Sequence, residues 1–208
     1  MKVIFCLGLC FTLHFIAVAQ VSQEKYPNGQ LKAEGELLDG IKNGSWTFYY
    51  PSGIKSAVET YRNGELDGEV RYFDEGENLL AVENWSEGLQ ADSSHYFHAN
   101  GQLQKKGIFK DGLYHGSWVF YNEEGILVRE GEYAEGQPNG AWTMYDEEGV
   151  IMQSGSYKDG KEHSQWKFYN RKGQLEYEGR YNRGEAIGEW YYFNKKGKKI
   201  PIDPRNQP

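Results

Sequence analysis

Residues 116–139 read GSWVFYNEEGILVREGEYAEGQPN, and residues 140–163 read GAWTMYDEEGVIMQSGSYKDGKEH. Both stretches hold 24 residues and place glycines and aromatic residues at the same offsets, counted from zero at the first glycine. The same spacing runs without insertion or deletion from Gly44 to Ile187, as six full units with a fragment at each end. A fixed period of this length is the signature of a repeat architecture. The glycine at offset 20 recurs as Gly40, Gly64, Gly88, Gly112, Gly136, Gly160 and Gly184.

Each unit carries two turn signals, a triplet ending in glycine at offsets 7–9 (PSG, EEG) and another at offsets 18–20 (RNG, KDG). Glycine in third place suits a type I turn followed by a left-handed residue, whereas an NG pair can form a two-residue turn instead. The segments between turns, such as SWVFY, are aromatic or β-branched and alternate with polar residues. The sequence therefore predicts an all-β fold: an elongated antiparallel meander of β-hairpins in a single twisted sheet.

One hairpin of this length buries too little apolar area to offset the conformational entropy lost on ordering it. We therefore expect each unit to pair with its neighbours on both sides, as in other repeat proteins. Composition agrees with a sheet-rich, turn-rich chain, because 15% of the residues are aromatic and 26 are glycine.

Alternation along the strands sorts the side chains onto two faces. The tryptophans at offset 2 are expected in the core, and the glycines at offset 15 leave room for their rings. The aromatic residue at offset 5 lies on the opposite face among mostly polar neighbours, where it forms a candidate binding ladder. Stacking across strands, which only stabilises the sheet, is the alternative interpretation of this ladder. The predicted core residues are Trp46, Trp118, Trp142, Trp166 and Trp190, and the ladder residues are Tyr49, Phe73, Phe97, Tyr121, Tyr145, Tyr169 and Phe193.

The pattern Gly-x-Trp-x-Phe-Tyr-x-x-x-Gly-x-Leu-x-x-x-Gly-x-Tyr-x-x-Gly resembles the MORN repeat, and is closest to the bacterial variant of the YwqK-type antitoxin family. The resemblance covers residues 25–199. It implies a β-hairpin array that serves as a scaffold for protein contacts or, in some members, for membrane contacts. The antitoxin label implies neutralisation of a partner toxin by binding.

The first residues have the features of a signal peptide. Lys2 precedes an apolar run, and Ala17 and Ala19 occupy the small-residue positions before an expected cleavage between Ala19 and Gln20. An uncleaved membrane anchor is the alternative, although the run is short for a bilayer span. We therefore expect a signal peptide (1–19), a partial repeat (20–43), six repeats (44–187), a second partial repeat (188–200) and a Pro-rich tail (201–208), in an exported protein that is periplasmic, at the cell surface or secreted.

Cleavage would remove both cysteines, Cys6 and Cys10, and one of the 23 basic residues, leaving 22 against 30 acidic residues and a net charge of −8. An acidic exterior argues against nucleic acid as a partner and disfavours anionic membranes, because both require a basic surface.

No catalytic, cofactor or metal motif is legible in the sequence. His95 and His98 are three residues apart in an expected strand and project to opposite faces, while His115 and His163 occupy equivalent positions next to the start of a unit. The lysines and prolines after residue 194 can protect the edge of the last strand or form a basic patch. The sequence thus predicts a protein that is not an enzyme and has no cofactor.

The units from 68 to 115 depart from the pattern. Val70 and Ser94 replace tryptophan, and Glu59 and Glu83 replace the offset-15 glycine. These departures indicate either neutral drift or a pocket or bend where two rings are missing.

Taken together, the residues favour an exported, non-catalytic scaffold that binds an unknown protein or envelope partner. Two alternatives stay open: an antitoxin or immunity protein that neutralises one toxin, and a glycan-binding module of the cell surface.

Overall fold

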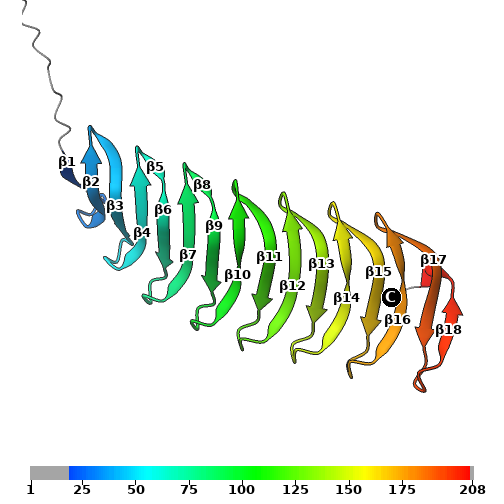
Figure 1. Cartoon of the computed structure of the whole chain (residues 1–208). Helices are drawn as coiled ribbons and strands as arrows, with labels where there is room; N and C mark the ends of the chain where they lie inside the picture. Colours follow the sequence, from blue (N-terminus) through cyan, green and yellow to red (C-terminus); the bar gives the residue numbers. More distant parts are fainter. Residues whose placement is uncertain (1–18, 207–208) are drawn as a thin grey trace, which may run out of the picture.

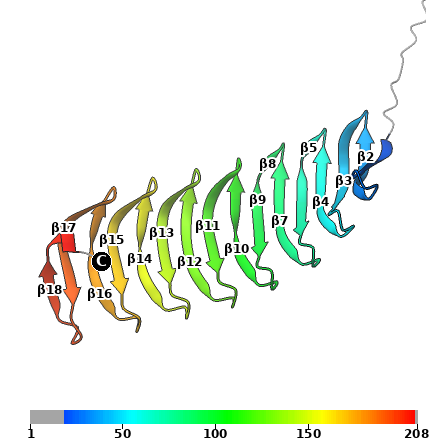
Figure 2. The same ribbon diagram turned by 180° about the vertical axis from the view of Figure 1, so that it is seen from behind.

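The computed structural model describes residues 19–206 as one antiparallel sheet (Figures 1 and 2). The predicted signal peptide lies outside the described residues, apart from Ala19. The elements are β1 (Ala19–Lys25), β2 (Leu31–Leu38), β3 (Ile41–Tyr49), β4 (Lys55–Arg62), β5 (Glu65–Leu66), β6 (Gly68–Phe73), β7 (Leu79–Ser86), β8 (Leu89–Gln90), β9 (Asp92–Phe97), β10 (Leu103–Lys110), β11 (Leu113–Tyr121), β12 (Leu127–Ala134), β13 (Gln137–Tyr145), β14 (Ile151–Lys158), β15 (Lys161–Tyr169), β16 (Leu175–Asn182), β17 (Glu185–Phe193), β18 (Lys199–Ile202) and the 3₁₀ helix η1 (Pro204–Asn206).

Strands pair in chain order, from β1 with β2 to β17 with β18. The short strands β5 and β6 both pair with β4, and β8 and β9 both pair with β7, so each couple is one interrupted strand. The predicted all-β hairpin meander is confirmed. Within residues 19–206, no helix is long and apolar enough to cross a membrane.

The two turn types that the sequence left open are both used, one at each edge of the sheet. At offsets 19 and 20 both residues have positive φ, as at Asn63 (52°) and Gly64 (87°), which defines the two-residue type I′ turn. At the other edge only the last residue is left-handed, as at Gly53 (87°), which fits a type I turn followed by a left-handed glycine. Where Gly76 is displaced by one position, Glu77 takes the left-handed conformation instead (64°).

A β-bulge interrupts the first strand of each unit at offset 0. All seven equivalents of Gly44 have positive φ, between 56° and 117°, including the non-glycine residues Asp92 and Ser164. Around Gly44 the register moves from Gly35↔Trp46 to Glu36↔Asn43, so two residues of β3 bulge out. Such bulges bend the strand and increase its twist.

The core is a row of tryptophans, each lying over the glycine of the preceding unit. A Cβ atom at Gly35, Gly107, Gly131, Gly155 or Gly179 would overlap the adjacent indole ring. Three of the indole N–H groups also donate to a backbone carbonyl next to that glycine, at 2.9–3.1 Å. Despite the single-layer sheet, all five predicted core residues are buried, with exposed fractions of 1% (Trp46), 0% (Trp118), 6% (Trp142), 1% (Trp166) and 0% (Trp190).

In the divergent units, the glycine–tryptophan pair is replaced by a carboxylate and a smaller residue. Glu59 and Glu83 stand where the glycines would be, and Val70 and Ser94 stand where the rings would be. Val70, Ser94 and Glu83 are buried, at 0%, 0% and 7% exposed. Glu83 accepts hydrogen bonds from Tyr96 (2.7 Å) and from the Trp85 indole (3.0 Å). The carboxylates and their hydroxyl partners therefore fill space that tryptophan fills elsewhere, and the departures are matched in pairs.

Backbone hydrogen bonds tie consecutive units together at the type I′ edge. The N–H of each offset-20 glycine from Gly64 to Gly184 donates to a carbonyl of the preceding unit, as from Gly64 to Lys42 (2.9 Å) and from Gly136 to Tyr114 (3.1 Å). At the C-terminal end, β18 pairs with β17 and η1 packs on β17. Ile202 lies opposite Trp190, which explains why this terminal tryptophan is fully buried.

Candidate functional site

The two faces of the sheet differ in their chemistry. The core face carries the tryptophans and, from Phe109 to Trp190, a chain of ring contacts, such as Tyr114 stacked on Trp118 with centroids 3.9 Å apart. Lys105 and Arg129 lie over these rings and cover them, the Arg129 guanidinium being 3.8 Å from the centroid of Phe120. The opposite face presents residues of offsets 1, 3, 14 and 16, and we call it the polar face. Its members include Ser45, Glu69, Arg71, Ser117, Glu132, Ala141, Gln165, Arg180 and Glu189, all exposed.

The predicted ladder lies on the polar face, where each strand runs into its type I turn. All seven ladder residues are half-buried. None of the ring–ring contacts in residues 19–206 involves a ladder residue, so these rings do not stack on one another. Lysines approach two of them, Lys55 over Phe73 (5.5 Å) and Lys199 over Phe193 (5.9 Å). The geometry therefore gives no support to direct stacking of the ladder rings.

Two ladder hydroxyls are held by acidic neighbours on the same face. Tyr49 donates to Glu34 and Tyr145 donates to Glu130, both at 2.7 Å. The hydrogen bond to Glu34 raises the pKa of Tyr49, with burial adding to it. Burial, followed by the hydrogen bond to Glu130, raises the pKa of Tyr145 to about 12. These two hydroxyls are thus committed donors in the folded protein.

The hydroxyls of Tyr121 and Tyr169 differ from this pair. At the position equivalent to Glu34 and Glu130, the units of Tyr121 and Tyr169 carry Lys106 and Ser154. Within the described part of the chain, neither hydroxyl makes a hydrogen bond. Tyr121 and Tyr169 therefore offer polar groups that are open to a ligand.

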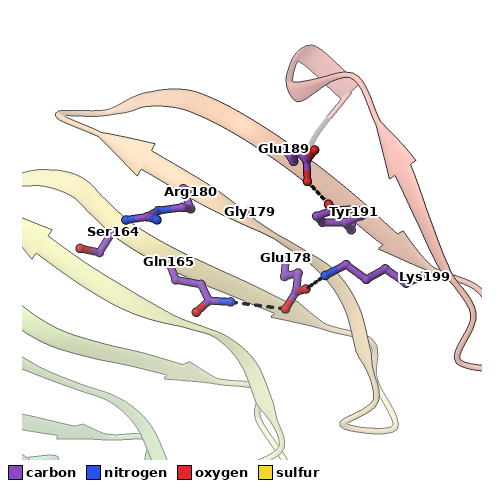
Figure 3. A pocket seen from close by; sticks show the side chains of 8 residues that line it. All are labelled: Ser164, Gln165, Glu178, Gly179, Arg180, Glu189, Tyr191 and Lys199. Carbon is purple, nitrogen blue, oxygen red and sulfur yellow. Dashed lines mark hydrogen bonds and ion pairs between the residues drawn. The ribbon is translucent and has the colours of Figure 1, made fainter.

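A shallow hollow of about 560 Å³ lies on the polar face near the C-terminal end (Figure 3). On one side, Glu178 accepts hydrogen bonds from Lys199 (2.7 Å) and Gln165 (3.4 Å). Figure 3 also shows Tyr191 donating to Glu189, a hydrogen bond that raises the pKa of the tyrosine. The Arg180 side chain lies across the hollow from these pairs. The hollow combines both charge signs, which suits recognition of a polar ligand group.

The histidines are the side chains that would first be considered for a catalytic or metal centre. His98 contacts the carbonyl of Tyr121 at 2.9 Å, a structural link between units. Within residues 19–206, no group of three or more His, Cys, Asp or Glu side chains could hold a metal ion.

Several functional features were not predicted from the sequence. The acidic partners of the ladder, Glu34 and Glu130, occupy offset 14, and their recurrence at a distance of 15 residues before a ladder tyrosine was a usable signal. The hollow around Arg180 had no such signal, because it depends on β18 folding back against β17.

Comparison with known proteins identifies the family of the repeat. The pattern of the MORN repeat variant matches residues 21–39, 42–63, 96–111, 114–135, 138–159 and 162–183, which is more than half of the chain. The unmatched stretch 64–95 contains Val70, Glu83 and Ser94, where tryptophan and glycine are replaced.

Other comparisons add little detail. No curated protein matches the chain. Among solved structures, the crystal structure of TcdB2-TccC3-TEV is similar at 14% identity and a TM-score of 0.25 over 88% of this chain. A Tc holotoxin pore of Photorhabdus luminescens is similar at 13% identity and a TM-score of 0.23, also over 88%. This chain spans 11% of the length of each of those chains. On the strength of the six matched segments and the hairpin array they form, the chain belongs to the MORN repeat variant family.

Proposed function

We propose that this protein is an exported, non-catalytic scaffold whose polar face binds a protein of the cell envelope through the aromatic ladder. MORN repeats form scaffolds for contacts with proteins or membranes, and the family is generally non-catalytic. The residues of the polar face support the proposal that the ladder holds a protein partner.

The observation that carries the proposal is a periodic row of half-buried rings that have no ring partners. Aromatic side chains supply large apolar contact area at a low cost in conformational entropy, and tyrosine adds a hydrogen bond. Two strands separate successive ladder residues, so the rings recur about every 10 Å. Such a row suits an extended surface or segment that touches several units at once.

Export rests on the sequence of residues 1–19, which lie outside the described residues except for Ala19. The net charge of −8 after cleavage disfavours nucleic acid and anionic lipid as partners. Amino-terminal sequencing of the protein from the envelope fraction checks this part, because Gln20 is the expected first residue.

The ladder is tested by a double substitution, Tyr121→Ser with Tyr169→Ser. These hydroxyls are uncommitted and their rings have no ring partners, so we expect capture of the envelope partner to be lost while the midpoint of thermal unfolding changes by only a few degrees. Quantitative capture from the solubilised envelope fraction, paired with thermal unfolding by circular dichroism, measures both.

The matched control is Tyr177→Ser, which removes a tyrosine ring from the core face on β16, the strand next to that of Tyr169. It should retain partner capture. A double variant that unfolds, or that captures the partner as well as the parent chain does, would show that the ladder is structural. Retention of the parent protein on insoluble polysaccharide, or suppression of a toxin encoded beside it, would replace the proposed partner by a glycan or a toxin.

A further inference from the structure

The edge of the sheet that holds the type I turns has a segregated charge distribution. This edge runs along the bottom of Figure 1, at the turns that follow β11, β13, β15 and β17. Two consecutive turns are acidic and the next two are basic. They carry Glu123 and Glu124, then Glu147 and Glu148, then Arg171 and Lys172, then Lys195, Lys196 and Lys198.

These charged side chains are free in the folded chain. All of them are exposed. Among the described residues, the ion pairs join other groups, and none includes a charge from these four turns. Successive turns are about 10 Å apart along the sheet, which is slightly more than the Debye length at physiological ionic strength. The acidic and basic halves therefore do not neutralise one another within a single chain.

A hollow of about 600 Å³ lies where the sign of the charge changes, between the turns at 146–148 and 170–171. Its lining includes Glu148, Val150, Tyr169 and Arg171. It also includes Met152, which is 51% exposed and follows Ile151, 38% exposed. Apolar side chains thus sit uncovered at the midpoint of the charged edge.

We infer that this edge is a self-complementary interface through which two copies of the chain associate in antiparallel fashion. A two-fold axis between the turns at 147–148 and 171–172 brings the acidic turns of one copy against the basic turns of the other. The same axis brings the two hollows and the two Met152 side chains together. A two-fold interface must be self-complementary in this way, and it closes at two copies.

The charge order selects this partner over the alternatives. A polyanion or an anionic membrane would be attracted by the basic turns but repelled by the acidic turns. A basic partner would be attracted by the acidic turns and repelled by the basic turns. A second copy satisfies both halves with one arrangement and covers the apolar midpoint as well.

Charge reversal tests the interface. The variant Arg171→Glu with Lys172→Glu, and the variant Glu147→Lys with Glu148→Lys, should each weaken self-association at least about tenfold, because like charges then face each other across the axis. An equimolar mixture of the two variants should associate again, since every contact between unlike variants pairs opposite charges. Light scattering after size exclusion, at low salt, should give a mass of two chains for the parent and for the mixture.

The control is Lys158→Glu with Lys161→Glu, which changes the net charge by the same amount at the opposite edge of the sheet. This control variant should associate as the parent chain does. About 1 M salt should weaken the association of both. A monomeric parent, a mixture that stays monomeric, an equal effect of the control, or polymers larger than two chains would each overturn the inference.

Discussion

At the scale of single residues, this protein is built on a size match between neighbours in adjacent units. A tryptophan is accommodated because the residue it covers has no side chain, and where the ring is missing a glutamate takes the place of the glycine. The match holds at all seven positions, from Gly35 with Trp46 to Gly179 with Trp190. A single-layer sheet has no second layer that could repack around a mismatched side chain. Each pair of an offset-15 residue and the offset-2 residue of the next unit therefore behaves as a small core of its own.

Gly131→Ala should therefore destabilise the protein by about 1–3 kcal/mol, because the added methyl group overlaps the Trp142 ring and forces it aside. Urea unfolding measures the loss. Combining Gly131→Glu with Trp142→Val, which copies the pair Glu59 and Val70, should cost less than the sum of the two single changes. Strict additivity would contradict the size match.

The tyrosines near the buried glutamates predict a loss of stability at alkaline pH. Burial, and then the charges of Glu83 and Glu59, raise the pKa of Tyr72 to about 12. Burial and the hydrogen bond to Glu83 also raise the pKa of Tyr96. A raised pKa stabilises the folded state fully below the pKa of the unfolded chain, about 10, and this stabilisation is lost as pH rises through the folded value.

The free energy of unfolding should therefore fall as pH rises from about 10 to about 12. Urea titrations across this range, followed together with phenolate absorbance, check the expectation. Tyr72→Phe should flatten part of the decline. An unchanged slope in that variant would assign the alkaline loss to other groups.

At the scale of elements, the repeat made the hairpins predictable but not their details. The 24-residue period and the two turn signals of each unit, with glycine at offsets 9 and 20, were enough to place the reversals of the chain, because few residues adopt positive φ as readily as glycine. The bulge at offset 0 was missed because Asp92 and Ser164 stand at two of its positions, which hid the shared requirement for positive φ.

The interruptions between β5 and β6 and between β8 and β9 were also not predicted, since they depend on how the units without tryptophan pair. For the candidate site, the ladder positions followed from strand alternation alone. Which hydroxyls are free depends on the neighbouring strand, where Glu130 binds Tyr145 but no counterpart binds Tyr169. These hydrogen bonds depend on the pairing register of two strands, which cannot be derived from the sequence of one strand.

Deleting one complete unit, residues 140–163, should preserve a cooperatively folded chain. The preceding and following units present equivalent strands, glycines and rings, so the new junction repeats contacts already present elsewhere. Deleting only residues 140–151 should abolish cooperative unfolding, because it removes one strand and reverses the direction of every later one. Thermal unfolding by circular dichroism distinguishes the two, and equal damage from both deletions would argue against interchangeable units.

At the scale of the whole molecule, the sheet is long, open and one layer thick, as both views show. Within residues 19–206, eighteen strand segments occupy sixteen positions, because β5 with β6 and β8 with β9 share one position each. At about 4.8 Å per step the sheet extends roughly 70 Å before twist is considered.

Small-angle scattering should accordingly report an elongated particle. A compact globule of this size would have a radius of gyration of about 16 Å, and the array should clearly exceed it. Measurement at high salt separates the single chain from any associated copies. A value near that of the globule would be incompatible with the extended sheet.

The bond from each offset-20 glycine to the preceding unit has a consequence for how such a chain changes over generations. Because the junctions from Gly64 to Gly184 are closed by the same backbone groups, as from Gly64 to Lys42 and from Gly136 to Tyr114, the units on either side of a duplicated or lost 24-residue segment can form the same hydrogen bond. Each such event would shift the distance between the two ends by about 10 Å, the width of two strands. The length of the array can therefore change in steps of one unit while the contacts between units stay the same.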